Sequence, residues 1–282
     1  MLVTNETPSI TWSITDLVSG SDWQTGAPFS QLTNGKPRVG CRLFRGSTVG
    51  GFRLDGTWAT ASRPKVIALL GLGEEWAGDF VTLSAYNVVT SSSEISLGNV
   101  NVSRLPDGSL AVLLIVPDGT IGFDVDTLRI SSASGGAAYT IGEVVVSTAT
   151  EWCIRRDWTE TVVALSKELR SVTGQPTAVR RVQQRKAVVT IAPQQWTKSF
   201  SASATVTLQK LQARLSQYQP VLVIPALRQP GLGAGAAIDM DSVLATMLFG
   251  TCSNLGQISL VSESNLSQLR LEFTEAPAGR IA

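Results

Sequence analysis

Histidine does not occur in this chain of 282 residues. A Ser-His-Asp triad, a Cys-His nucleophile, an imidazole general base and a histidine-containing zinc site are therefore all excluded. Cysteine is scarce as well: Cys41, Cys153 and Cys252 lie far apart and form no CxxC pair, which also excludes an all-thiolate zinc site. Their apolar or small neighbours favour buried free thiols, and a single disulfide would leave one thiol over. We expect no cofactor and no enzymatic activity.

Charged residues of either sign are also few. Charged residues make up 16% of the chain, and 23 Lys and Arg against 22 Asp and Glu give a formal net charge of +1. So neutral a chain does not predict general electrostatic attraction to nucleic acid or to an anionic membrane. Hydrophobic residues make up 43%, which is enough for one or two cores and argues against a long disordered chain.

Long hydrophobic runs are missing. The longest apolar stretches, 66–72 and 110–116, are far shorter than the roughly 20 residues that span a bilayer. The first residues, 1–12, lack the basic region and apolar run of a signal peptide. We therefore expect no membrane insertion, and a protein that is made in the cytoplasm and stays soluble or joins an assembly.

Short apolar, β-branched runs separated by Gly, Ser, Pro and Asp dominate the first half of the chain. This pattern predicts an all-β sandwich or barrel. Turns are expected at two Pro-Asp-Gly tripeptides, 106–108 and 117–119, because Pro presets φ and Gly accepts a positive φ. A change of texture near 147–152 predicts two domains, 1–148 and 149–282. Strands of the first domain are predicted at 65–70, 79–86, 110–116, 121–130 and 139–146.

The second half is predicted to be β-rich with one amphipathic helix. Leu208, Leu211 and Leu215 recur at helical spacing within 205–217, and Pro220 ends the helix. Strands of the second domain are predicted at 159–170, 179–191, 221–225, 243–249, 257–261 and 268–273.

Acidic residues suggest two candidate sites. Asp118, Asp124 and Asp126 could supply oxygens to calcium, the alternative being a turn aspartate and a solvated strand face. The pair Glu74-Glu75 is adjacent in sequence, and adjacent residues of a strand point to opposite faces, so a turn is favoured over an acid/base pair.

Two further motifs invite a binding interpretation. The glycine-rich segment 231–235 fits neither the dinucleotide-binding nor the P-loop pattern, so we interpret it as a flexible loop. Aromatic rings in loops could stack on sugars, although most rings of a sandwich pack in its core or at its edges. The candidates are Trp12, Trp23, Trp58, Trp76 and Tyr86.

Trp and Arg, which are enriched at interface hot spots, gather in two segments of the second half. A mixed-charge patch surrounds two tryptophans within 151–160, and a basic segment spans 180–186. On a strand Arg181 and Arg185 share one face while Arg180 and Lys186 share the other. This division favours a solvated strand or a salt-bridged subunit contact over nucleic-acid binding. The interface candidates are Trp152, Arg155, Arg156, Trp158, Arg181 and Arg185.

Three segments of the first half resemble a known family. They read APFSQLTNGKP at 27–37, RPKVIALLGL at 63–72 with Thr82-Leu83 further on, and YTIGEVVV at 139–146. They resemble the galactose-binding-like (discoidin-type) jelly roll at the front of certain phage tail proteins. In the second half 170–176 is similar to that family's R-S-x-G-G segment, with Thr173 in place of the first glycine, and 271–277 is similar to its F-x-E-x-P ending.

The resemblance covers most of the chain and implies a minor tail or distal-tail protein of a long-tailed phage (siphophage). Such a protein belongs to the virion tail tip, often as a homo-oligomer in a symmetric ring, with other phage tail proteins as its partners. An alternative is a carbohydrate-binding module that recognises host surface glycans, although no ligand residue is transferred by the resemblance. A polysaccharide-degrading tailspike would show converging carboxylates and stacked repeats, and the chain has no repeat of fixed period.

Overall fold

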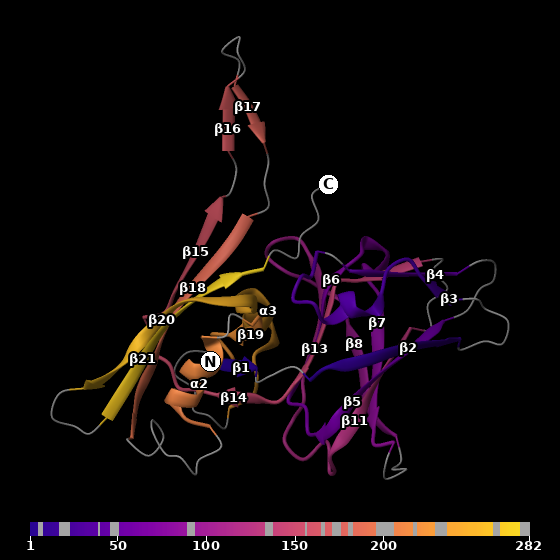
Figure 1. Cartoon of the computed structure of the whole chain (residues 1–282), viewed down its shortest axis with the longest axis horizontal. Coiled ribbons are helices and arrows are strands. Elements are labelled where there is room, and N and C mark those ends of the chain that lie inside the picture. The colour runs from indigo at the N-terminus through magenta and orange to yellow at the C-terminus, as the bar shows by residue number, and fades with distance from the viewer. Residues whose placement is uncertain are drawn as a thin grey trace. The chain divides into compact units, whose positions relative to one another are not determined.

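A computed structural model of the chain shows two compact units (Figure 1). The first unit is Thr4–Ala149, and the second unit joins Met1–Val3 to Thr150–Pro277. The sequence predicted a division at 148/149, but it did not predict that the first three residues belong to the second unit. They do so because Leu2 and Val3 pair with Ile224 and Val223. The structure describes residues 1–4, 8–16, 23–38, 40–45, 51–88, 94–132, 138–155, 157–164, 167–170, 176–179, 183–195, 206–216, 219–228, 236–261 and 266–276.

The first unit is an all-β sandwich, as predicted, and its described strands pair antiparallel. Sheets of five strands (β2-β5-β11-β7-β8) and four strands (β13-β6-β10-β9) are accompanied by one of three (β12-β4-β3). The chain alternates between sheets, so strands distant in sequence become neighbours, as in a jelly roll. The strands are β2 (Ile10–Asp16), β3 (Trp23–Thr25), β4 (Cys41–Arg45), β5 (Phe52–Ser62), β6 (Val66–Leu72), β7 (Phe80–Tyr86), β8 (Ile95–Asn101), β9 (Ser103–Arg104), β10 (Leu110–Ile115), β11 (Val125–Ser132), β12 (Ala138–Ile141) and β13 (Glu143–Ser147).

Burial in the first unit follows the sequence pattern. Every residue of β6 is buried, as its near-continuous hydrophobicity predicts. The predicted strand 121–130 is shorter, because the turn in which Thr120 N–H donates to the Pro117 carbonyl delays pairing until Val125. Ile121 is nevertheless buried in the core, and Phe123 packs against the core. The alternating sequence pattern therefore predicted the burial of these two residues correctly, although they do not pair in a strand.

The three segments that carry the family resemblance meet at one place in the first unit. Gly71 (φ +62°) and Gly142 both lie against the carbonyl of Pro37, and a Cβ at either position would overlap that oxygen. The Gly142 N–H donates to the Leu70 carbonyl at 3.0 Å. The Glu143 carboxylate accepts the Gly35 N–H at 2.9 Å. These glycines therefore serve close backbone packing.

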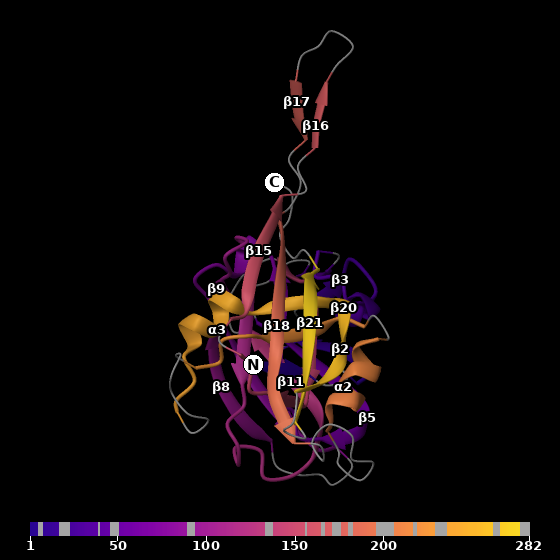
Figure 2. The same ribbon diagram turned by 90° about the vertical axis from the view of Figure 1, so that its left-hand side faces the viewer.

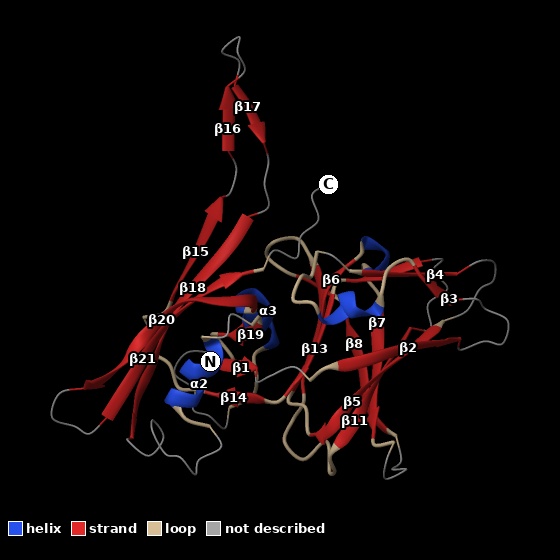
Figure 3. Ribbon diagram, in the orientation of Figure 1, coloured by secondary structure: helices blue, strands red, loops and turns tan. Residues whose placement is uncertain are grey.

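The second unit is organised around a seven-stranded sheet in the order β14-β1-β19-β20-β21-β18-β15, in which the strands from β1 to β15 pair antiparallel (Figures 2 and 3). One face of the sheet packs against Leu208, Leu211 and Leu215 of helix α2 in a common core. A separate two-stranded ladder, β16-β17, follows β15 in the chain and precedes β18. The elements are β1 (Leu2–Thr4), β14 (Ala149–Glu151), β15 (Thr159–Ala164), β16 (Lys167–Arg170), β17 (Pro176–Val179), β18 (Gln183–Gln195), α2 (Leu208–Leu215), β19 (Val221–Ile224), α3 (Met240–Thr246), β20 (Leu248–Val261) and β21 (Leu266–Glu275).

The helices correct the prediction of one helix for this domain. Helix α2 is confirmed and begins after Thr207, whose hydroxyl accepts the Lys210 N–H at 3.1 Å. The strand predicted at 243–249 is wrong over its first half, where helix α3 forms after its N-cap Asp239. Within the described residues, neither helix is long and apolar enough to cross a membrane.

Candidate functional site

The aromatic residues considered for sugar stacking belong largely to the interior of the first unit. Trp12, Trp58 and Trp76 are 6%, 3% and 0% exposed. The Trp76 indole N–H donates to the Thr140 carbonyl at 3.1 Å. The Tyr86 ring is half-buried, with the Arg129 guanidinium 4.8 Å from its centroid. The Trp23 side chain lies outside the described residues. The candidate rings that the structure describes, Trp12, Trp58, Trp76 and Tyr86, therefore form no exposed stacking platform.

The three aspartates considered for calcium have separate partners. Asp118 pairs with Lys65 at 2.5 Å, and this hydrogen bond lowers the pKa of Asp118 below its ordinary value. Asp124 pairs with Arg63 at 2.8 Å, while Asp126 accepts the Val88 N–H at 2.9 Å. No group of three or more Asp, Glu, Cys or His within the described ranges is placed to hold a metal ion. Asp118 and Asp124 are exposed, as the alternative of a turn aspartate and a solvated strand face expects, but Asp126 is only 4% exposed and does not fit a solvated face.

The remaining sequence motifs fall into structural roles or outside the described chain. Glu74 and Glu75 begin the short 3₁₀ turn η2 (Glu74–Trp76), as predicted. Arg104 binds the Glu74 carboxylate with both terminal nitrogens, at 3.0 and 2.7 Å, and these bonds lower the pKa of Glu74. The glycine-rich segment 231–235 lies outside the described residues. All three cysteines are free thiols; Cys41 and Cys252 are buried as expected, but Cys153 is exposed.

The six interface candidates are placed very differently. Trp152 is 7% exposed and belongs to the core of the second unit, against which Trp158 packs half-buried. Arg155 is exposed and pairs with Asp157 at 3.6 Å. Arg156 and Arg181 lie outside the described part of the chain. Arg185 is buried, which does not fit an exposed contact residue.

Arg185 is a structural residue of the second unit. Its side chain, 4% exposed, binds the Glu275 carboxylate through Nη2 at 2.6 Å and through Nε at 3.1 Å. The same guanidinium donates to the carbonyls of Ala245 and Met247 at the end of α3. Arg185 thus joins β18, β21 and α3, and Glu275, in the segment that resembles the family's ending, completes this link.

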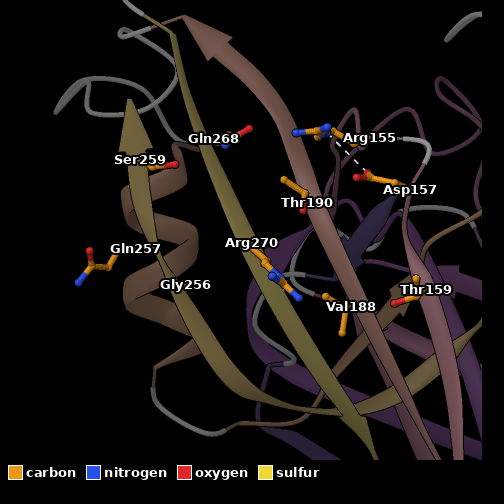
Figure 4. Close-up of a pocket in the computed structure, with 10 residues that line it drawn as sticks. All are labelled: Arg155, Asp157, Thr159, Val188, Thr190, Gly256, Gln257, Ser259, Gln268 and Arg270. Carbon is orange, nitrogen blue, oxygen red and sulfur yellow. Dashed lines mark ion pairs between the residues drawn. The ribbon is translucent and has the colours of Figure 1, made fainter. Parts of the chain in front are cut away.

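Arg155 also lines a surface depression of the second unit. It is a groove of about 520 Å³ on the face of the second unit's sheet that α2 does not cover (Figure 4). It crosses β20, β21 and β18 and reaches the segment that leads into β15. We call this feature the sheet groove. It is lined by Arg155, Asp157, Thr159, Val188, Thr190, Gly256, Gln257, Ser259, Gln268 and Arg270.

Strand alternation supplies the floor of the sheet groove. In β18 the residues Ala187, Val189 and Ile191 face the core, so Val188 and Thr190 face outward. In β21 the buried residues alternate with Gln268 and Arg270, and Thr190 lies directly opposite Arg270 in the ladder.

A β-bulge shapes one side of the groove. The register of β20 shifts between Leu255 and Ile258, so Gly256 and Gln257 both stand opposite Arg270. A Cβ at Gly256 would overlap the Arg270 carbonyl oxygen. From the other face of the sheet, the Gln212 side chain of α2 donates to the Gly256 carbonyl at 2.7 Å. The bulge is therefore held by the core side of the unit.

Among its described lining residues, the groove carries one cation without a carboxylate partner. Arg155 pairs with Asp157, and on the same face Lys186 pairs with Glu272 at 3.7 Å. Arg270 is exposed, and no ion pair or hydrogen bond joins its side chain to another described residue. The predicted strand 268–273 placed Arg270 at an outward position. Sequence alone did not show which strands would adjoin it, so the groove was missed.

No family model matches the chain, and no curated protein matches it. Among solved structures, a family 32 carbohydrate-binding module of C. perfringens NanJ in complex with galactose is 17% identical with a TM-score of 0.35, covering 50% of this chain and 93% of the module. A second module, CBM32-2 of a GH31 protein bound to GalNAc, is 12% identical with a TM-score of 0.35, covering 49% of this chain and 98% of the module. At this similarity the fold assignment rests on the strand order of the chain itself, and the sugars named for these modules are not transferred to it.

Proposed function

We propose that this chain is a non-enzymatic structural protein of a phage tail tip, which assembles with copies of itself and with other tail proteins. The resemblance of its motifs to tail proteins suggests this role. The observation that carries the proposal is the edge that β15 forms at one of the two ends of the second unit's sheet. Strand β15 ends the strand order, and no described strand pairs with its outer side.

The free edge has the character of a strand-pairing surface. An edge strand presents unpaired N–H and C=O groups to any strand that approaches it. Val162, at the middle of β15, is 53% exposed and is one of five large hydrophobic side chains that are exposed among the described residues. No charged residue stands between Thr161 and Ala164 to discourage pairing. A neighbouring copy could therefore add a strand here.

The ladder β16-β17 supports the same proposal. Its strands pair from Lys167↔Val179 to Arg170↔Pro176 and with no other described strand. A two-stranded ladder alone is at best marginally stable in water. Pairing with a strand of a neighbouring subunit would extend this ladder beyond two strands.

The test is the mass of the protein in solution, measured by sedimentation for the native chain, Val162→Lys and Val88→Lys. Val88 is the matched control, because it is also 53% exposed but lies in the first unit. A lysine at an edge strand opposes strand addition, whereas exposed substitutions change stability little. We expect assemblies for the native chain and Val88→Lys, and monomers for Val162→Lys. A monomeric native chain, or an unchanged assembly of Val162→Lys, would overturn the contact.

We also propose glycan recognition as a second candidate function, favoured by one feature of this chain. The sheet groove has a volume within the range of small-ligand sites, and nearly all of its lining side chains are polar. Such a lining suits hydroxyl-rich ligands. The site of recognition would then be the second unit, and not the aromatic residues of the jelly roll, which are largely buried.

A further inference from the structure

We propose that the sheet groove binds a sugar residue that carries a carboxylate, and that Arg270 pairs with this carboxylate. The inference goes beyond assembly and rests on glycan recognition, the second candidate function.

The charge of the groove selects a singly charged anion. Asp157 offsets Arg155, and Arg270 remains the one uncompensated charge among the lining residues that the structure describes. A guanidinium presents its donors in a planar fork that matches a carboxylate in a bidentate pair. One free cation complements a carboxylate better than a phosphate, which carries close to two charges at neutral pH.

The surroundings of Arg270 suit sugar hydroxyls. Thr190 lies opposite Arg270 on β18, and the bulge that contains Gln257 stands opposite Arg270 on β20, with the Gln257 side chain pointing away from Arg270 (Figure 4). Gln268 and Ser259 are paired positions on β21 and β20. The side chains of these four residues have no hydrogen-bond partner among the described residues, so their donors and acceptors are available. Amides and hydroxyls both donate and accept, as binding of sugar hydroxyls requires.

The volume and the polar lining of the sheet groove restrict the class of ligand further. About 520 Å³ accommodates one or two sugar rings rather than a folded partner's surface. Val188 is the only large apolar side chain in the lining, so an apolar ligand would leave the polar groups without partners.

The experiment is calorimetric titration of the full chain with acidic glycans and their neutral counterparts. The probes are tri-galacturonic acid with its methyl ester, and sialyllactose with lactose. We expect one acidic probe to bind, its neutral counterpart to bind at least tenfold more weakly, and Arg270→Gln to weaken acidic binding at least tenfold. Arg63→Gln is the control, because Arg63 is 59% exposed on the first unit and should leave binding unchanged. The thermal unfolding of Arg270→Gln should match that of the native chain, since Arg270 is exposed.

The other outcomes separate the two claims. Equal binding of acidic and neutral probes would overturn the carboxylate inference and leave glycan recognition standing. Acidic binding that survives Arg270→Gln would overturn the assignment to this groove. Stronger competition by inorganic phosphate than by acetate would also overturn the choice of carboxylate. Failure of every probe to bind would overturn both the inference and the second candidate function.

Discussion

Glu143 shows how a single residue links packing to pH in the first unit. It is 4% exposed, and its carboxylate receives the backbone N–H of Gly35 at 2.9 Å. Burial raises the pKa of Glu143 to about 8, and the backbone hydrogen bonds from Asn34, Gly35 and Lys36 oppose this rise. Because desolvation is the larger effect, Glu143 holds a proton at neutral pH.

This pKa predicts a pH dependence of folding. A group whose pKa is raised on folding stabilises the native state at low pH, and that stability is lost as the pH rises from about 4.5 to about 8. The contribution should fall by up to about 1.4 kcal/mol per pH unit in this window. Glu143→Gln should flatten the slope.

Hydrogen exchange of β13 between pH 5 and pH 9, corrected for the intrinsic exchange rate, measures this effect. Equal slopes for the native chain and Glu143→Gln would show that Glu143 does not titrate in this window.

At the scale of elements, the sequence predicted correctly those strands and helices whose hydrophobic pattern is continuous or periodic. It failed where a capping residue and an apolar run favour different local structures. The all-buried strand β6 and the leucine spacing of α2 follow directly from sequence periodicity. Helix α3 was missed because Val243 and its apolar neighbours resemble a strand, while the cap at Asp239 decided the local structure. The sequence did not predict that Arg185 is buried, because its partner Glu275 lies 90 residues away in the chain.

The link between β18, β21 and α3 predicts a large effect at Arg185. Arg185→Met would leave Glu275 buried without its cation, which costs on the order of 3–5 kcal/mol. Arg185→Met with Glu275→Leu should recover most of this loss, because no buried charge remains. Lys186→Met is the control: its ion pair with Glu272 is partly exposed, so its loss should cost less than about 1 kcal/mol.

Hydrogen-exchange protection of β18 and β21 is the appropriate measurement, since it reports on the second unit alone. Equal loss of protection in Arg185→Met and Lys186→Met would contradict the structural role given to Arg185.

At the scale of the whole molecule, the sequence indicated two β-rich parts and a role in assembly, but it did not locate the surfaces. The free edge at Val162 and the groove at Arg270 depend on which strands become neighbours, and that order is set by long-range pairing. The segments that carry the family resemblance share a structural role in the first unit. Their residues Pro37, Gly71, Gly142 and Glu143 lie in one tightly packed place.

The central claim, that the chain belongs to a phage tail tip, is tested most directly by immunogold electron microscopy of virions with antibodies against the purified protein. The account predicts gold at one end of the tail, in a fixed number of positions around its axis. Virions that carry no label, from lysates in which the protein is present in soluble form, would contradict it.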